Sequence, residues 1–152
     1  MRTTGSPIEG QIWQRLESEH QQLHDALTDV RGLVAASSYT TARKRFGTFR
    51  MSLERHLAAD SRLLVLCEDD RKLERFLRRV RRNRAQILEQ AERVWAQLCH
   101  EKGGALPRML GRLSRLVVAN EADQRRLILA DLPLSPERRR LHRVLLLELG
   151  AI

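Results

Sequence analysis

Positions whose numbers differ by 64 have the same kind of apolar side chain along most of this chain, and the two copies align without a gap. Large aliphatic or aromatic residues recur at this offset through both halves. The pairs are Leu16 with Val80, Leu23 with Ile87, Val30 with Val94, Phe46 with Leu110, Phe49 with Leu113, Leu53 with Val117, Leu63 with Leu127 and Leu64 with Ile128. Such a repeat indicates a duplicated supersecondary unit that buries its apolar face against the second copy. The chain is therefore predicted to fold from two similar helix pairs.

Within each copy the apolar residues recur every three or four positions, which is the period of an amphipathic helix. The first helix is predicted to begin at Ser6-Pro7-Ile8-Glu9, because serine caps a helix, proline suits its first position and glutamate reaches back to the cap. We expect four helices over about 7–35, 40–67, 71–101 and 105–131, and a short fifth helix that ends near 149.

Short turns between the first four helices predict an all-α fold, namely an up-down-up-down four-helix bundle with an extra short C-terminal helix. We expect a single domain over 1–152, with the bundle at about 7–131 and the added helix at about 135–149. The apolar face of this helix contains Leu141, Val144, Leu145 and Leu149. Further leucines beyond that face predict either a cap on the bundle end or a contact with a protein partner or a second copy.

Composition limits the environment in which such a chain works. Its 152 residues suffice for one hydrophobic core, and no run of 18 uncharged apolar residues is present, so no membrane span is expected. The two cysteines make no disulfide framework, which favours a reducing, cytoplasmic location. The formal net charge of +9 indicates an anionic partner such as nucleic acid, but arginine outnumbers lysine 25 to 3, and a GC-rich genome produces the same bias.

Three polar residues interrupt the apolar faces of the first half at one height. His20 lies about fifteen residues before the end of the first helix, and His56 and Asp60 lie about sixteen to twenty residues after the start of the second. Antiparallel neighbours joined by a short turn bring these positions level, and the spacing of His56 and Asp60 puts both on one helix face. We therefore expect the three side chains to converge in the interior.

The second half has Arg84, Asn120 and Gln124 at the corresponding positions. Buried imidazoles and carboxylates need partners, so either a metal ion binds them or the guanidinium of Arg84 replaces the metal charge. In the second arrangement Arg84 faces Asp60 across the core, and Asn120 and Gln124 take further hydrogen bonds.

At these residues the chain resembles the hemerythrin-like family of HHE cation-binding domains. The resemblance covers about residues 10–131. It rests on His20 in the first helix, on His56-Leu57-Ala58-Ala59-Asp60 in the second, and on the recurrence of these positions at the same offset in the second half. Members of the family are four-helix bundles that hold two irons between their helix pairs and bind oxygen, sense redox state or store iron.

By this resemblance, His20, His56 and Asp60 are ligands of one iron, and His24, one helical turn after His20, is a candidate fourth ligand. The second half does not complete the family's ligand set. Its replacements are Arg84 and Asn120 for histidine and Gln124 for an acidic residue. We expect either no cofactor or a single metal ion, with iron as the first candidate.

These patterns favour a non-enzymatic module with a partly lost di-iron site that acts in sensing, regulation or protein interaction. One alternative is a mononuclear non-haem iron protein or enzyme, because two histidines and one carboxylate also describe that kind of site. A second alternative is a binder of nucleic acid or of an acidic partner. It would use the outward-facing arginines at the start of the third helix, Arg71, Arg75, Arg78 and Arg82.

Overall fold

The structure, a computed structural model, describes residues 7–64, 71–101, 103–128 and 135–150. These residues form four long helices, α1 (Pro7–Ala35), α2 (Tyr39–Leu64), α3 (Glu74–Cys99) and α4 (Leu106–Ile128), the shorter α5 (Pro136–Gly150), and a 3-10 turn, η2 (Arg71–Leu73). The all-α prediction is confirmed. No helix in the described ranges has both the length and the apolar character needed to cross a membrane. The predicted cap at Ser6 lies outside the described residues.

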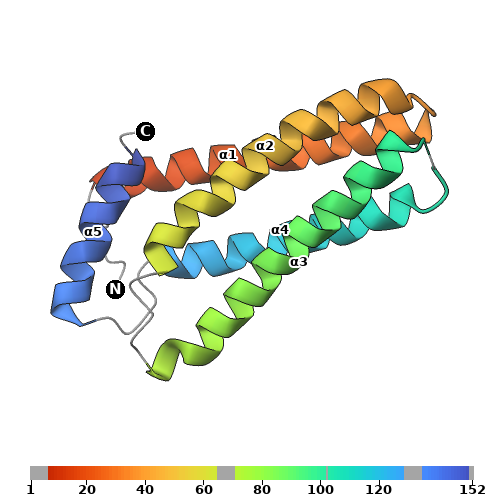
Figure 1. Cartoon of the computed structure of the whole chain (residues 1–152). Coiled ribbons are helices and arrows are strands. Elements are labelled where there is room, and N and C mark those ends of the chain that lie inside the picture. Colours follow the sequence, from red (N-terminus) through yellow and green to blue (C-terminus); the bar gives the residue numbers. More distant parts are fainter. Residues whose placement is uncertain (1–6, 65–70, 102, 129–134, 151–152) are drawn as a thin grey trace.

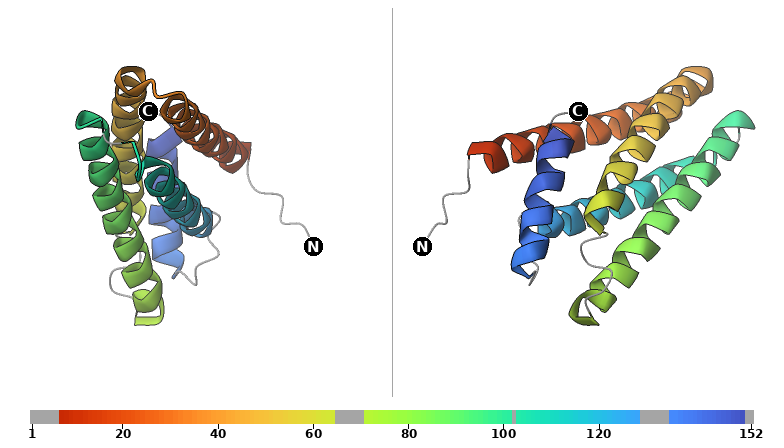
Figure 2. Two further views of the ribbon diagram at one scale, coloured as in Figure 1. Left: turned by 90° about the vertical axis from the view of Figure 1, so that its right-hand side faces the viewer. Right: turned by 60° about the vertical axis from the view of Figure 1, so that its left-hand side comes forward.

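Consecutive long helices run antiparallel and pack in pairs, α1 with α2 and α3 with α4 (Figure 1). Further contacts join α2 to α3 and α1 to α4, so each long helix has two neighbours around a shared interior. Figure 1 and the right-hand view of Figure 2 show α5 at the end of the long helices that is remote from the α1–α2 and α3–α4 turns. There α5 packs against α1 and α2.

The shared interior is lined by equivalent residues of the two copies. Five of the predicted pairs are buried at both positions, with exposed fractions of 4% or less. They are Leu23 with Ile87, Val30 with Val94, Phe46 with Leu110, Phe49 with Leu113, and Leu53 with Val117. Leu16 is only half-buried, whereas its counterpart Val80 is buried. The side chains of Leu63, Leu127 and Ile128 lie outside the described residues.

The duplication extends to the turns. Ser37 and Glu101, which are equivalent positions of the two copies, both have a left-handed backbone, with φ of 57° and 54°. Each donates its amide hydrogen to the carbonyl three residues earlier, Ser37 to Val34 at 3.0 Å and Glu101 to Leu98 at 3.3 Å. A left-handed residue commonly ends a helix by satisfying one of its last carbonyls. The helices α1 and α3 therefore end in the same way.

The apolar stripe predicted for α5 is partly exposed. Leu141 and Val144 are 46% and 50% exposed, and Leu147 is 45% exposed. His142 is buried. The side chains of Leu145 and Leu149 lie outside the described residues. An apolar face of α5 consequently points outward.

Candidate functional site

His20 of α1 and His56 of α2 both contact Gln124 of α4 in the interior. Nε2 of His20 lies 2.6 Å from Oε1 of Gln124, and Nε2 of His56 lies 2.9 Å from the same oxygen. The imidazole rings pack edge to face, with centroids 5.1 Å apart. All three side chains are buried. Three helices that are distant in the sequence thus contribute to one polar cluster.

The shared acceptor determines where the imidazole protons lie. An amide oxygen only accepts hydrogen bonds, so both Nε2 atoms carry hydrogen and donate to Gln124. Nδ1 of His20 is buried with no hydrogen-bond partner among the described residues, which fits a neutral ring. Nδ1 of His56 lies 3.2 Å from Oε2 of Glu19. A proton on that nitrogen donates to the carboxylate, and His56 is then an imidazolium.

Two acid–base groups of the cluster have shifted pKa values. The pKa of Glu19 lies below its ordinary value of 4.5, chiefly because the hydrogen bond from His56 stabilises the carboxylate. The pKa of His20 lies below its ordinary value of 6.5, chiefly because burial disfavours the charged ring. At neutral pH we therefore expect a charged Glu19 and a neutral His20.

A second polar pair lies one helical turn along α1. Nε2 of His24 is 2.8 Å from Oε1 and 3.1 Å from Oε2 of Glu121 on α4. Glu121 is almost fully buried, whereas His24 is half-buried. The predicted fourth ligand therefore pairs with a carboxylate that sequence reasoning missed. The available signal was the position of the charged Glu121 directly after Asn120. Asn120 itself is buried, as expected.

Arg84 was expected to face Asp60 across the core, but it lies at the edge of the helix pair. It is half-buried on α3 and donates to the backbone carbonyl of Leu57 and, at 2.8 Å, to Oγ of Ser61, both on α2. A long arginine stem can lie over apolar residues while its guanidinium reaches the wet edge, which avoids the cost of full burial. The side chain of Asp60 lies outside the described residues, so its role as a ligand stays a prediction.

Polar contacts between α3 and α4 were also missed by sequence reasoning. Asn83 and Gln90 each donate an amide hydrogen to a backbone carbonyl of α4, at 3.3 and 2.9 Å. Asp123 of α4, which is buried, accepts a hydrogen bond of 2.6 Å from Arg79. The seven-residue spacing of Asn83 and Gln90, two helical turns, was the signal that both share one face.

The donor atoms of the cluster do not fit a metal ion as they are arranged. Among the described residues, no three His, Cys, Asp or Glu side chains come together as a metal-binding group. Imidazole binds a metal through an unprotonated nitrogen, but both Nε2 atoms carry hydrogen toward Gln124. A cation at this place would have to displace the amide of Gln124 and both protons.

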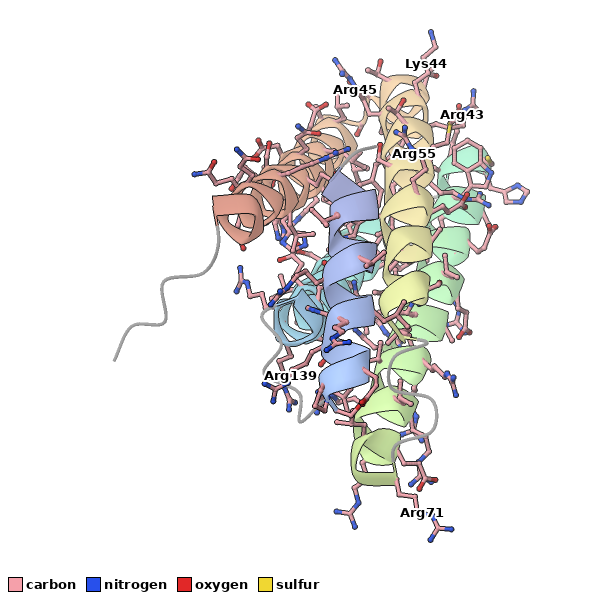
Figure 3. The ribbon with its side chains drawn as sticks, turned by 90° about the vertical axis from the view of Figure 1, so that its left-hand side faces the viewer. Arg43, Lys44, Arg45, Arg55, Arg71 and Arg139 are labelled. Atoms are coloured by element: carbon pink, nitrogen blue, oxygen red, sulfur yellow. The ribbon has the colours of Figure 1, made fainter. Side chains whose placement is uncertain are left out.

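The predicted arginine patch is exposed but is not the only basic surface. Arg71, Arg75, Arg78 and Arg82 are all exposed, and Arg78 pairs with Glu74 at 3.5 Å. Figure 3 shows basic side chains on other helices as well as Arg71, which lies at one end of the molecule. They are Arg43, Lys44 and Arg45 near the start of α2, at the opposite end, and Arg139 on α5. The positive charge is thus spread widely.

A groove of about 570 Å³ runs between α2 and α3. Its apolar lining includes Leu53, Leu57 and Leu88, and charged residues of both helices stand along its rim. Leu88 is 44% exposed. Sequence reasoning missed this groove because the separation of two neighbouring helices is set by packing and not by the pattern of either helix.

Comparison with known proteins found no match to a family model, to a curated protein or to a solved structure. The resemblance to hemerythrin-like domains therefore rests on the residues and spacings of this chain.

Proposed function

We propose that the chain is a non-enzymatic protein-interaction module derived from a hemerythrin-like bundle whose metal site has been lost. One observation carries this proposal. The amide oxygen of Gln124 accepts hydrogen bonds from both His20 and His56 at the point where the two imidazoles converge. A neutral amide there satisfies both rings without a cation.

The proposed ancestry has support beyond the aligned apolar residues. The left-handed turn residues Ser37 and Glu101 are equivalent in the two copies, so the copies share backbone geometry as well as sequence pattern. Together with the antiparallel packing of neighbouring helices, this supports an up-down-up-down bundle built from a duplicated helix pair.

Catalysis by the interior cluster would require a group that reaches a substrate. His20 and His56 are buried, and each directs Nε2 to a partner within the chain. Binding then falls to the surface, where the groove between α2 and α3 exposes apolar side chains. The module thus acts by holding another protein, and the polar cluster serves to fix how its helices pack.

Metal analysis of the purified chain tests the proposal. We expect no stoichiometric metal in the native protein and little thermal stabilisation by added Fe(II), Zn(II) or Mn(II). The variant Gln124→Glu supplies a carboxylate between two imidazoles and should raise metal affinity by about tenfold or more, because two histidines and a carboxylate form a common metal-binding set.

The matched control is Gln90→Glu, which changes another buried glutamine whose amide donates to a backbone carbonyl. It should gain no metal affinity. One metal ion per chain, retained by the native protein through purification, would contradict the proposal. That result would instead favour a mononuclear metal protein or enzyme.

A further inference from the structure

Most of the net positive charge of the chain lies in the second copy of the repeat. Helices α3 and α4 contain 12 arginines and five acidic residues, whereas the equivalent residues of the first copy, 10–35 and 42–64, contain eight basic and six acidic residues. The formal charges of these ranges are therefore +7 and +2. A genome-wide bias toward arginine acts on both copies alike and does not explain the difference. Charge asymmetry between two halves of a chain indicates a polyanionic partner for the basic half.

Exposed arginines lie along the outer side of the seam between α3 and α4. Hydrogen bonds from Arg79 to Asp123 and from Asn83 to the carbonyl of Leu116 mark this seam. Residues three or four positions away are neighbours on a helix surface, so exposed arginines at this spacing from the seam, or from Arg112 beside it, form one surface. This surface, the α3–α4 basic face, comprises Arg75 and Arg82 of α3 and Arg108, Arg112, Arg115 and Arg126 of α4.

The charges of the α3–α4 basic face are not neutralised within the part of the chain that the structure describes. None of its six arginines forms an ion pair with another described residue. All five acidic residues of α3 and α4 pair with other side chains instead. Glu74 pairs with Arg78, Glu89 with Arg93, Glu92 with Arg50, Asp123 with Arg79 and Glu121 with His24. Six positive charges therefore remain for a partner.

The aromatic rings of α3 and α4 are covered by other side chains. The guanidinium carbons of Arg79 and Arg126 lie 5.3 and 5.0 Å from the ring centroid of Phe76, which is buried. Trp95 packs toward α2, beside Gly47. Proteins that bind single strands stack bases on exposed aromatic rings, so the basic face lacks the platform for that mode. The contacts with Phe76 also hold two guanidiniums in place before a partner arrives.

The chemistry of the basic face distinguishes among anionic partners. A protein interface has an apolar core, and a membrane-binding helix inserts apolar side chains. Among the described residues of α3 and α4, the large apolar side chains that are most exposed are Leu88 and Val118. Leu88 lines the α2–α3 groove, and Val118 lies about 200° around α4 from Leu116, away from the seam. A polar, strongly positive surface is typical of nucleic-acid interfaces.

We propose that the α3–α4 basic face binds the sugar–phosphate backbone of double-stranded nucleic acid without reading its sequence. From Arg108 to Arg126 the face extends about 27 Å along α4. A DNA duplex has one negative charge for about every 1.7 Å of its axis, so phosphates are available to all six arginines. This binding goes beyond the protein contact proposed for the α2–α3 groove, which lies on the other side of α3.

Fluorescence anisotropy with labelled duplexes of about 20 base pairs, one of DNA and one of RNA, is the first test. We expect binding that is equal for a scrambled sequence and that weakens steeply with salt. Four to six phosphate contacts give a slope of about −4 to −5 for the logarithm of the association constant against that of the salt concentration. The duplex that binds more tightly identifies the source of the backbone.

Substitution of three arginines of the basic face is the second test. Arg82→Gln, Arg112→Gln and Arg115→Gln together should weaken binding by about tenfold or more and flatten the salt slope by about 3. The corresponding lysine substitutions should retain most of the affinity, because lysine also binds phosphate as a point charge.

The matched control removes the same charge from the first copy. Arg31→Gln, Lys44→Gln and Arg55→Gln together change three exposed basic residues outside the basic face. Binding should change by less than about threefold, and the salt slope should stay the same, because these residues contact no phosphate. Circular dichroism of every variant checks that the helices remain folded.

No binding of either duplex at about 50 mM salt and about 100 μM protein would overturn the inference. Equal losses in the two triple variants would also overturn it, because they would show attraction by net charge alone. Tighter binding of a single strand than of either duplex would contradict the duplex assignment. Polyglutamate that binds as tightly as a duplex would indicate an acidic protein as the partner and would likewise overturn the proposal.

Discussion

The ring of Tyr39 lies against Gly103 and fills the space that a side chain at that glycine would need. A Cβ atom at Gly103 would overlap the Tyr39 hydroxyl oxygen and come within 2.8 Å of the ring carbon that bears it. The numbers of the two residues differ by 64, so equivalent positions of the two copies meet here. These two equivalent positions cannot both have large side chains, because the ring of Tyr39 occupies the space beside Gly103. The duplicated halves therefore had to diverge at this contact.

We expect Gly103→Ala to destabilise the protein by about 1–3 kcal/mol, because the tyrosine ring must move from a packed position. The adjacent Gly104 has no atom within 4 Å of the place where a Cβ would stand. Gly104→Ala should therefore change the free energy of unfolding by less than about 0.5 kcal/mol. Urea unfolding of both variants measures the difference, and equal effects would show that Tyr39 does not restrict this turn.

The left-handed turn residues predict a small gain in stability. Glycine adopts positive φ without the steric cost that a side chain incurs, although it loses more entropy on folding. Ser37→Gly and Glu101→Gly should each stabilise by about 0.5 kcal/mol and by similar amounts. Thermal unfolding measures this, with Ser38→Gly as the control, because Ser38 lacks positive φ. A loss of stability in either variant would contradict the shared turn geometry.

The pair formed by His24 and Glu121 should behave as a coupled unit. His24→Leu leaves the buried carboxylate of Glu121 without its partner and should destabilise by about 1–3 kcal/mol. The equivalent positions of the other copy, between α2 and α3, are Leu88 and Leu57. Replacing both His24 and Glu121 by leucine should therefore cost less than the sum of the single changes, with a coupling of about 0.5–3 kcal/mol. A double-mutant cycle by chemical denaturation measures the coupling. Additive effects would show that the contact contributes nothing.

Stability should fall on acidification, in two steps of the same sign. The lowered pKa of His20 means that the unfolded chain takes up a proton more readily, so stability declines once the pH drops below about 6.5. The lowered pKa of Glu19 adds a further decline below about 4.5, as its carboxylate is protonated. Denaturation midpoints against pH measure both steps. Glu19→Gln should flatten the second one only.

Arg84 should contribute modestly to the free energy of unfolding. Its hydrogen bonds go to a backbone carbonyl that retains a second lone pair and to a serine hydroxyl at the edge of the groove. Arg84→Ala should therefore cost about 0.5–1.5 kcal/mol, against less than about 0.5 kcal/mol for the exposed Arg82→Ala. A loss of about 3–5 kcal/mol would indicate that Arg84 compensates a buried carboxylate, as sequence reasoning expected.

Much of the fold could be predicted from the sequence because helical periodicity is a local property. The limits of α1 agree with prediction at both ends, and the helices α2 to α5 were placed within a few residues. The convergence of His20 and His56 with Gln124 was also predictable. Short turns between antiparallel helices fix which residues are level, and each helix face fixes which of them point inward.

Other features depend on how side chains and helices settle against one another. Nothing in the local pattern of α5 distinguishes the face with Leu141 from the face with His142, since leucines lie on several sides. The route of Arg84 to α2 depends on a flexible stem and on the carbonyl it finds there. Glu121 could be recognised as a partner of His24 only once α1 and α4 were seen to be neighbours at that height.

The sequence by itself determined the helices, their apolar faces and the level at which polar residues of different helices meet, because these follow from the fixed rise and period of a helix. Only the tertiary structure decided that the amide oxygen of Gln124 accepts hydrogen bonds from both imidazoles. It also decided that His24 and Glu121 pair between α1 and α4, and that a groove opens between α2 and α3. The physical reason is that hydrogen bonds and ion pairs act over a few ångströms. Their partners are therefore selected by the packing of whole helices, which no single stretch of sequence contains.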